Sequence, residues 1–472
     1  MNEEKLKKLI HDVYDNVAAY REFIKEMTGS DSLPVNLNVD KVDLASLPLC
    51  DKQNYLLRHD VRALSREGDL NRIHLIGASS GFSSSGAVHW PKCPEDERGY
   101  MESIETMFIH YYNIDTRRTL VIECLALGLW IGGMQLAAAL RHIAIYGGHP
   151  FTICTPGLDL RSAVDIMKEY DGIFDQVLIL TNPSNIPLIT ALMEDTGLRI
   201  NGGNIYFPVV GEYYTEQFRE QTAKRFGHST DDPFVVWTGY GSADTGLIGT
   251  ETTATIALRK FFFHHPELSL QFFGTESTPM LLQLSDECRI EIVDGQIVCT
   301  KNQFFPLIRY NTKDSGILLS KCDLHDIIPD SLYATLPDEI LCVMGRVDNQ
   351  IVFYGTNLNV NDIAEHLLTL PSDYGYGGLY TVQERIVGGV QTYHFVFYVK
   401  DIDKCASAVR FLDAVVDYAR GNNAEFNYKY GNLTQSATVP LLSAEIADID
   451  RQESVINIIT PTIKKQREIC AA

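Results

Sequence analysis

The sequence predicts an α/β protein: a large N-terminal domain of doubly wound α/β layers with a β-rich subdomain, and then a small C-terminal α+β domain. Short apolar runs alternate with segments of helical periodicity between about residues 95 and 240, which is typical of parallel sheets covered by helices. From about residue 250 the chain shows short runs and turn signals such as Asp294-Gly295. Another change near Gly345 predicts a boundary between domains 1–344 and 345–472.

Composition narrows the class of protein. The chain has 472 residues, which leaves room for more than one domain. A net charge of −21 argues against a nucleic-acid partner, although a local pocket in an acidic protein can still bind ATP. Ten cysteines without a Cys-x-x-Cys pair predict reduced thiols, and the N-terminus lacks the apolar core of a signal peptide. We therefore expect a cytoplasmic protein.

The chain is expected to begin with one amphipathic helix over residues 3–27, because apolar side chains recur there at three- and four-residue spacings. The alternating region that follows is predicted to form helices at Glu95–Tyr112, Ile131–Tyr146, Leu160–Tyr170, Ile186–Asp195 and Thr215–Phe226. Its predicted strands are Leu120–Ala126, Phe151–Thr155, Gln176–Thr181, Ile205–Val210 and Val235–Thr238.

One apolar run, Leu120–Leu140, has the length of a membrane span. Glu123, Gln135 and several glycines interrupt it, so a buried strand, a glycine turn and a core helix fit better. We expect no membrane partner.

The β-rich region is predicted from five short segments. The expected strands are Thr252–Leu258, Leu268–Phe273, Met280–Leu284, Arg289–Val293 and Gln296–Thr300. In the C-terminal domain, strands are expected at Gln350–Tyr354, Tyr380–Ile386, Thr392–Lys400 and Thr438–Ile446, and helices at Val360–Leu370 and Ala406–Ala419.

A serine- and glycine-rich loop at Ser79–Gly86 is the first candidate binding element. It contains five serines and two glycines, so backbone N–H groups and hydroxyls can approach phosphate oxygens closely. A solvated turn between two strands is the alternative. No lysine of the Walker type follows the loop, which argues against a P-loop NTPase.

Four further stretches, in order with this loop, resemble the adenylate-forming ligase superfamily, and its phenylacetate–CoA ligase-like branch most of all. The loop is similar to Ser-Ser-Gly-Thr-Thr-Gly-Lys-Pro, although Ser85 and Gly86 replace the Lys-Pro pair. The other stretches are Val210-Gly-Glu-Tyr-Tyr-Thr-Glu-Gln, Tyr240-Gly-Ser-Ala-Asp244, Pro306-Leu-Ile-Arg-Tyr-Asn-Thr-Lys-Asp314 and Gly345-Arg-Val-Asp-Asn-Gln-Ile. The resemblance covers nearly the whole chain.

The resemblance implies ATP- and Mg²⁺-dependent adenylation of a carboxylic acid, and then transfer of the acyl group to CoA. The first step brings two anions together, so it needs positioning and charge neutralisation. The residues that the resemblance assigns to ATP or AMP are Ser79, Ser80, Gly81, Ser83, Ser84, Gly211, Glu212, Tyr240, Gly241, Ser242, Asp314 and Arg346.

Three further roles are implied. Asp244 stands where the family has a Mg²⁺-binding glutamate, and hard carboxylate oxygens suit that ion. Asp348 matches the hinge about which the small domain moves between the two steps. Lys464 is expected to be catalytic together with Arg346, with Lys465 as the alternative, although the glycine that precedes the family's lysine is missing.

The acyl pocket is less well specified. Trp130, Ile131 and Tyr240 are candidate walls and suggest a flat or aromatic acid, or a small one, while core packing is the alternative for Trp130. His264-His265 and Cys322-Asp-Leu-His325 could donate to zinc, but neither has a paired-ligand pattern.

Two other functions remain open at this stage. The acyl acceptor could be an amine or an amino acid, which would make the protein an amide synthetase. The missing loop lysine, the aspartate at 244 and the unusual lysine context also fit a non-catalytic nucleotide-binding relative. A homodimer is an open possibility.

Overall fold

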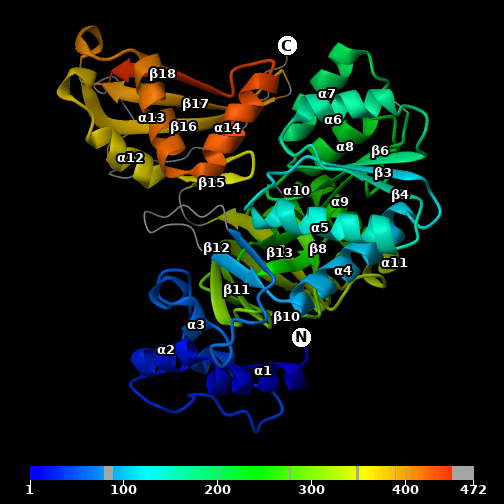
Figure 1. The fold of residues 1–472 in the computed structure, drawn as a ribbon, viewed down its shortest axis with the longest axis vertical. Helices are drawn as coiled ribbons and strands as arrows, with labels where there is room; N and C mark the ends of the chain where they lie inside the picture. The colour runs from blue at the N-terminus through cyan, green and yellow to red at the C-terminus, as the bar shows by residue number, and fades with distance from the viewer. Residues whose placement is uncertain are drawn as a thin grey trace.

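The computed structural model describes residues 1–78, 89–200, 202–275, 278–346, 350–388, 390–399 and 401–448. Figure 1 shows N-terminal helices at one end, a central body of sheet and helices, and a smaller C-terminal unit at the other end.

The N-terminal region forms two helices where one was expected. Helix α1 (Glu3–Asn16) and helix α2 (Ala18–Thr28) are separated by Val17, whose backbone is extended and forms an isolated bridge with Arg66. The β-branched valine favours this conformation, and the break turns α2 so that both helices bury an apolar face in one cluster. The short helix α3 (Val61–Leu64) follows.

Two strands flank the serine-rich loop. Strand β1 (Leu75–Ala78) precedes the loop and pairs antiparallel with β2 (His89–Lys92), which follows it. Ala78 also donates from its N–H to the carbonyl of Leu129 at 2.7 Å. Helix α4 (Pro94–Tyr112) starts directly after β2, with Pro94 at its first position.

Within the described residues, eleven strands form one sheet, and half of it is parallel. The parallel strands are β3 (Thr119–Glu123), β4 (Phe151–Cys154), β5 (Gln176–Leu180), β6 (Ile205–Val209) and β7 (Val236–Ser242), in the spatial order β4-β3-β5-β6-β7. The helices between them are α5 (Ile131–Tyr146), α6 (Leu160–Glu169), α7 (Asn185–Thr196) and α8 (Glu216–Arg225).

The predicted alternation in this region is confirmed. The apolar run at Leu120–Leu140 is a buried strand, a loop with glycine and a core helix. No helix in the described part of the chain is long and apolar enough to cross a membrane.

The other half of the sheet is antiparallel. Its strands are β8 (Gly246–Thr250), β9 (Met280–Leu284), β10 (Cys288–Val293), β11 (Gln296–Lys301), β12 (Leu307–Ser320) and β13 (Glu339–Arg346). Asp294 and Gly295 both have positive φ, as the predicted two-residue turn between β10 and β11 requires. A short helix α11 (Asp330–Tyr333) lies between β12 and β13.

Two predicted strands in this region are wrong. Thr252–Leu258 lies in helix α9 (Thr253–His264) and Leu268–Phe273 in helix α10 (Pro266–Phe273). The physical reason is at the helix starts: the Thr252 hydroxyl accepts from the Thr255 N–H, and Pro266 occupies the first position of α10. The β-branched threonines in Thr252–Leu258 favour a strand in the sequence analysis. In the structure, Leu258 and Phe262 lie one helical turn apart and pack in the same core cluster.

The C-terminal unit is α+β, as predicted. It contains a hairpin of β14 (Gln350–Phe353) and β15 (Thr356–Asn359), and a three-stranded sheet of β16 (Tyr376–Val387), β17 (Val390–Val399) and β18 (Leu442–Asp448). Its helices are α12 (Val360–Leu368), α13 (Ala408–Asn422) and α14 (Ala424–Ser436), the last of which was not predicted. This unit contacts the large body through α14 against α6 and β17 against α7.

Candidate active site

Several predicted site residues lie outside the described residues. These are the loop residues Ser79, Ser80, Gly81, Ser83 and Ser84, the hinge residue Asp348 and the catalytic candidate Lys464. Their roles stay predictions. The remaining candidates can be placed.

Tyr240, Asp314 and Arg346 come together from three strands. The Tyr240 hydroxyl donates to Asp314 Oδ2 at 2.6 Å, and both side chains are half-buried. Asp314 on β12 is the register partner of Arg346 on β13. Burial raises the pKa of Tyr240 well above its usual value, and the Asp314 carboxylate acts in the same direction. The phenol therefore stays protonated and can serve as the donor of this bond.

Asp244 lies in the tight turn between β7 and β8. A Cβ on Gly241 would lie 2.3 Å from the carbonyl oxygen of Gly246, so only glycine allows the two strands to approach this closely. The Tyr310 hydroxyl donates to Asp244 Oδ2 at 2.5 Å, and Gln303 Nε2 donates to the Asp244 carbonyl at 2.7 Å. The first bond orients the carboxylate, and the second holds the backbone of the turn.

The residues around Asp244 fit Mg²⁺ only if the ion takes most of its ligands from outside the protein. Within the described ranges, no group of three or more His, Cys, Asp or Glu side chains is placed to hold a metal ion. Mg²⁺ commonly binds one or two carboxylates and takes its other ligands from substrate phosphates and water. Asp244 therefore fits a metal that arrives with ATP.

Lys92 is a nearby cation that the sequence analysis missed. It ends β2, only 5% of it is exposed, and burial lowers the pKa of its ammonium group. The carboxylates of Asp96, Glu97 and Asp244 favour the charged form, while Lys301 opposes it. A lysine in the otherwise apolar stretch Trp90–Cys93 was the available signal. A basic side chain that interacts electrostatically with Asp244 is therefore present, although the serine-rich loop contains none.

Gly211 and Glu212 follow β6 at the carboxyl edge of the sheet. The Glu212 carboxylate accepts from the Ser184 N–H at 3.0 Å and from its hydroxyl at 2.8 Å, which fixes it across the ends of β5 and β6. Burial raises the pKa of Glu212 to about 7; the Ser184 bonds and Lys429 act against this shift, and Glu384 acts with it.

The C-terminal unit lies directly on this edge. Gly355, in the turn between β14 and β15, has φ +78°, and a Cβ on it would lie 2.7 Å from Asn182 Nδ2. That amide donates to the carbonyl of Val210 at 2.8 Å. Lys429 on α14 donates to the carbonyl of Tyr354 at 2.7 Å and holds the turn in place.

The two candidate acyl-pocket residues at the start of α5 have different surroundings. Ile131 is 3% exposed, and a Cβ on Gly77 would lie 2.7 Å from its Cβ, so Ile131 packs against β1 in the core. Trp130 is half-buried, and its backbone forms an isolated β-bridge with Ala78, the residue before the serine-rich loop. Whether either contacts a substrate stays a prediction.

A buried ion cluster supports the loop that contains Gly211 and Glu212. Arg219 on α8 contacts Glu251 at 2.5 Å and Glu216 at 3.3 Å, and Arg259 on α9 contacts the same two acids at 3.1 and 3.2 Å. The Tyr214 hydroxyl donates to Glu251 at 2.7 Å.

Arg309 has a separate structural role. Its Nε contacts Glu291 at 3.2 Å and its Nη1 donates to the carbonyl of Leu47, so it ties the N-terminal region to the sheet.

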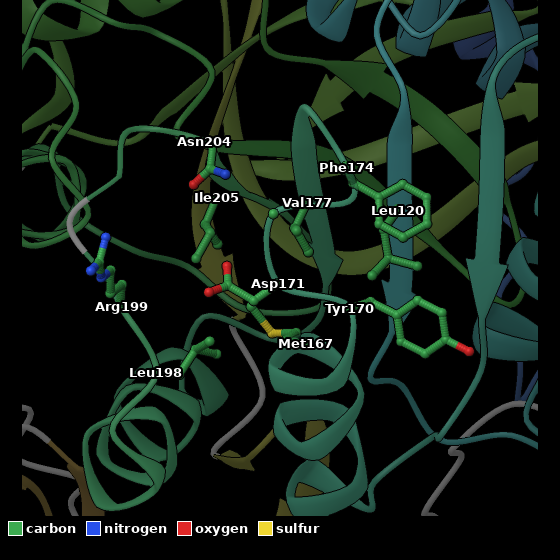
Figure 2. A pocket seen from close by; sticks show the side chains of 11 residues that line it. Leu120, Met167, Tyr170, Asp171, Phe174, Val177, Leu198, Arg199, Asn204 and Ile205 are labelled. Atoms are coloured by element: carbon green, nitrogen blue, oxygen red, sulfur yellow. The ribbon is translucent and has the colours of Figure 1, made fainter.

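Two cavities lie away from these residues. Figure 2 shows one of about 30 Å³ that is lined at the amino ends of β3, β5 and β6 by Leu120, Val177 and Ile205. It lies at the opposite edge of the sheet from Glu212 and is far too small for a nucleotide. A cavity of about 460 Å³ opens between α1 and α4 and is lined by paired charges such as Arg72 and Glu95.

Comparison with known proteins identifies the fold. No protein-family model and no curated protein matches the sequence. Among solved structures, 2-hydroxyisobutyryl-CoA ligase bound to 2-HIB-AMP and CoA in the thioesterification state has a TM-score of 0.63 at 13% identity, over 99% of this chain and 89% of that chain. The same ligase in its postadenylation state has a TM-score of 0.52 at 14% identity and the same coverage.

A second kind of ligase also shares the fold. The amide bond synthetase McbA from Marinactinospora thermotolerans has a TM-score of 0.50 at 10% identity, over 80% of this chain and 66% of that chain. The predicted fold, that of the adenylate-forming ligases with a large N-terminal and a small C-terminal part, is confirmed. At these identities the likeness concerns the fold, and the chemistry has to be argued from the residues.

Proposed function

We propose that this chain, which has the fold of the adenylate-forming ligases, activates a carboxylic acid with ATP and transfers the acyl group to CoA. The observation that supports this most is the 2.6 Å hydrogen bond from the Tyr240 hydroxyl to Asp314 Oδ2. Asp314 is in turn the register partner of Arg346 on the neighbouring strand. These residues come from three separate stretches, and a shared site for one nucleotide gives a reason for their meeting.

In the first step, a carboxylate oxygen of the acid attacks the α-phosphorus of ATP, and pyrophosphate leaves. The Asp314 carboxylate would accept from the ribose hydroxyls, with the Tyr240 hydroxyl fixing its orientation. Glu212, held by Ser184, would border the base. Arg346 would contribute a forked cation, and Lys464 would bridge the reacting oxygens.

Charge neutralisation would come from Mg²⁺, which Asp244 would hold, and from a lysine in the same region. Mg²⁺ bound to Asp244 would draw charge from the phosphate oxygens that enter its coordination shell. Lys92 adds a fixed positive charge in the same region. We propose that it offsets the absence of a lysine in the serine-rich loop.

In the second step, the thiol sulfur of CoA attacks the acyl carbonyl carbon, the bond to phosphate breaks and AMP leaves. The alternative acceptor is an amine, which gives an amide by the same exchange of bonds. The shared fold of the CoA ligase and the amide bond synthetase leaves both acceptors open. We propose domains at residues 1–344 and 345–472, with movement about Asp348 between the two steps.

The test of the first step is acid-dependent exchange of labelled pyrophosphate into ATP. We expect exchange with at least one acid of a broad panel and none without acid. Complete absence across the panel would leave the non-catalytic alternative. CoA and a set of amines would then be added to the preformed adenylate. Amide without thioester would overturn the proposed acceptor.

Asp244→Asn tests the metal role separately. It keeps the shape of the side chain but removes the charge, so we expect the Mg²⁺ concentration for half-maximal exchange to rise at least about tenfold. The matched control is Tyr310→Phe, which removes the bond to Asp244 Oδ2 but leaves the carboxylate. An unchanged Mg²⁺ requirement in Asp244→Asn would remove this residue from the site.

A further inference from the structure

Glu123 is a buried acid for which the described residues offer no hydrogen-bond partner. It is the last residue of β3, its exposure is 0%, and neither carboxyl oxygen has a partner in the part of the chain that the structure describes. An orphaned carboxyl of this kind is costly, because burial removes the water that would otherwise hydrate it. Burial raises the pKa of Glu123 to about 8.

A second acid nearby shows the contrast. Glu97 on α4 is 4% exposed and accepts from Gln135 Nε2 at 2.5 Å. Both acids raise the pKa of Tyr100, in addition to the larger effect of burial. The fold therefore supplies a donor to Glu97 and leaves Glu123 without one.

The surroundings bring the backbone close to this carboxyl. Gly133, in the first turn of α5, would place a Cβ 3.4 Å from Glu123 Oε1 and 2.2 Å from the carbonyl oxygen of Ala126. A side chain at this position would clash with the Ala126 carbonyl, so glycine lets the first turn of α5 approach Glu123 closely. Trp130, the candidate pocket wall, precedes the same helix.

The position of Glu123 in the sheet is also that of a ligand site. Strand β4 lies on one side of β3 and β5 on the other, so the strand order reverses at β3. In open α/β sheets, ligands bind beyond the carboxyl ends of the strands at such a reversal. Glu123 is at that end of β3, and Asn182, Gly211 and Tyr240 lie at the same ends of β5, β6 and β7.

We propose that the Glu123 carboxyl binds a hydrogen-bond donor on the acyl part of the acid, so that the substrate class is a hydroxy or amino carboxylic acid. The inference rests on the proposed adenylation. A substrate hydroxyl or ammonium group would supply the partner that the described residues do not provide. A site built around a buried polar group discriminates strongly against an analogue without the matching group, because the protein group is then left unpaired.

The test is pyrophosphate exchange with matched acids. Each set contains a parent acid and its hydroxy and amino derivatives, in one small aliphatic and one aromatic series. We expect kcat/KM for at least one donor-bearing acid to exceed that of its parent by about 100-fold or more. Equal or higher kcat/KM for the parents would overturn the proposal.

Variants separate recognition from structure. In Glu123→Leu, the ratio of kcat/KM for the donor-bearing acid to kcat/KM for its parent should fall to about one. The KM for ATP should stay unchanged. Glu123→Gln can still accept from a hydroxyl, but it cannot give up a proton and become the anion that would pair with an ammonium group. It should therefore keep the preference for a hydroxy acid and lose the preference for an amino acid, which distinguishes the two donors. Glu97→Gln is the matched control and should keep the wild-type preference. Circular dichroism and ATP-induced shifts in Tm verify that each variant is folded.

The outcomes distinguish two failures. No exchange with any acid, parents included, would refute the proposed adenylation and this inference with it. Exchange whose preference is the same in the wild type and in both Glu123 variants would refute this inference alone.

Discussion

At the scale of single residues, the bond between Tyr240 and Asp314 joins positions 74 residues apart. The sequence assigned both to the nucleotide by resemblance, but it could not show that they touch. The bond orients an ionised acceptor, and bonds to charged groups contribute about 1.5–3 kcal/mol each.

Tyr240→Phe should weaken the site without dismantling it. The phenyl ring keeps its packing while Asp314 loses one oriented donor, so we expect the KM for ATP to rise about tenfold with a smaller change in kcat. Steady-state exchange kinetics measure this. Tyr213→Phe is the control, because its hydroxyl donates to the carbonyl of Thr278 instead. Equal effects of the two substitutions would contradict a specific role for Tyr240.

Glu123 should make stability depend on pH. The usual pKa of this side chain is 4.5, and burial raises it to about 8 in the folded state. Between these values the folded protein retains a proton that the unfolded chain has lost, so stability falls as pH rises from about 4.5 to about 8. At about 1.4 kcal/mol per pKa unit, the loss is several kcal/mol.

Glu123→Gln should remove this slope. The free energy of unfolding of variant and wild type, followed by chemical denaturation between pH 5 and 8.5, should diverge in the variant's favour as pH rises. The pKa of Glu212, raised to about 7, contributes in the same window but is common to both proteins, so the difference isolates Glu123. Parallel curves would show that Glu123 keeps an ordinary pKa.

At the scale of elements, the ion cluster of Arg219, Arg259, Glu216 and Glu251 fixes α8 and α9 to the end of β8. All four side chains are essentially buried, so each charge depends on its partners. Removal of one member leaves an uncompensated charge in the interior.

Arg219→Leu should therefore destabilise the protein by about 3–5 kcal/mol. Arg161→Leu is the control, because Arg161 pairs with Asp195 at the surface, where an ion pair contributes at most about 1 kcal/mol. Denaturant midpoints of the two variants measure the contrast. Similar midpoints would mean that solvent reaches the cluster.

At the scale of the whole molecule, the C-terminal unit sits on the large body through the β14–β15 turn. Gly355 approaches Asn182 where a Cβ would be only 2.7 Å from Nδ2, and Gly355 also has φ +78°. The contact joins the ends of β5 and β6 to the C-terminal unit, next to Glu212.

Gly355→Ala should loosen this contact while both parts stay folded. We expect faster limited proteolysis between residues 340 and 360 and a larger radius of gyration in solution scattering. Gly388→Ala is the control, since Gly388 also has positive φ (+56°) but has no neighbour within 4 Å of a built Cβ. Gly388→Ala should lower the free energy of unfolding by about 1–3 kcal/mol through backbone strain, without separating the two parts. Identical scattering of both variants would contradict the role of Gly355.

The sequence by itself determined the α/β class, the alternation of elements from Glu95 to Thr238, the Asp294-Gly295 turn and the order of the candidate motifs. These follow from local periodicity and turn chemistry, which are written in neighbouring residues. It misassigned α9, because β-branched residues at a helix start resemble a strand until the cap is seen. It misassigned α10, because the apolar and polar residues alternate in Leu268-Ser-Leu-Gln-Phe, as they do in a strand.

Only the tertiary structure decided which side chains contact one another and which have no hydrogen-bond partner among the described residues. It brought Tyr240 to Asp314, set Lys92 near Asp244 and placed the C-terminal turn on Asn182. Among the described residues, it also left the Glu123 carboxyl without a hydrogen-bond partner. The physical reason is that burial and long-range pairing set the charge state and the hydrogen bonding of a side chain, and both depend on packing between segments far apart in the chain.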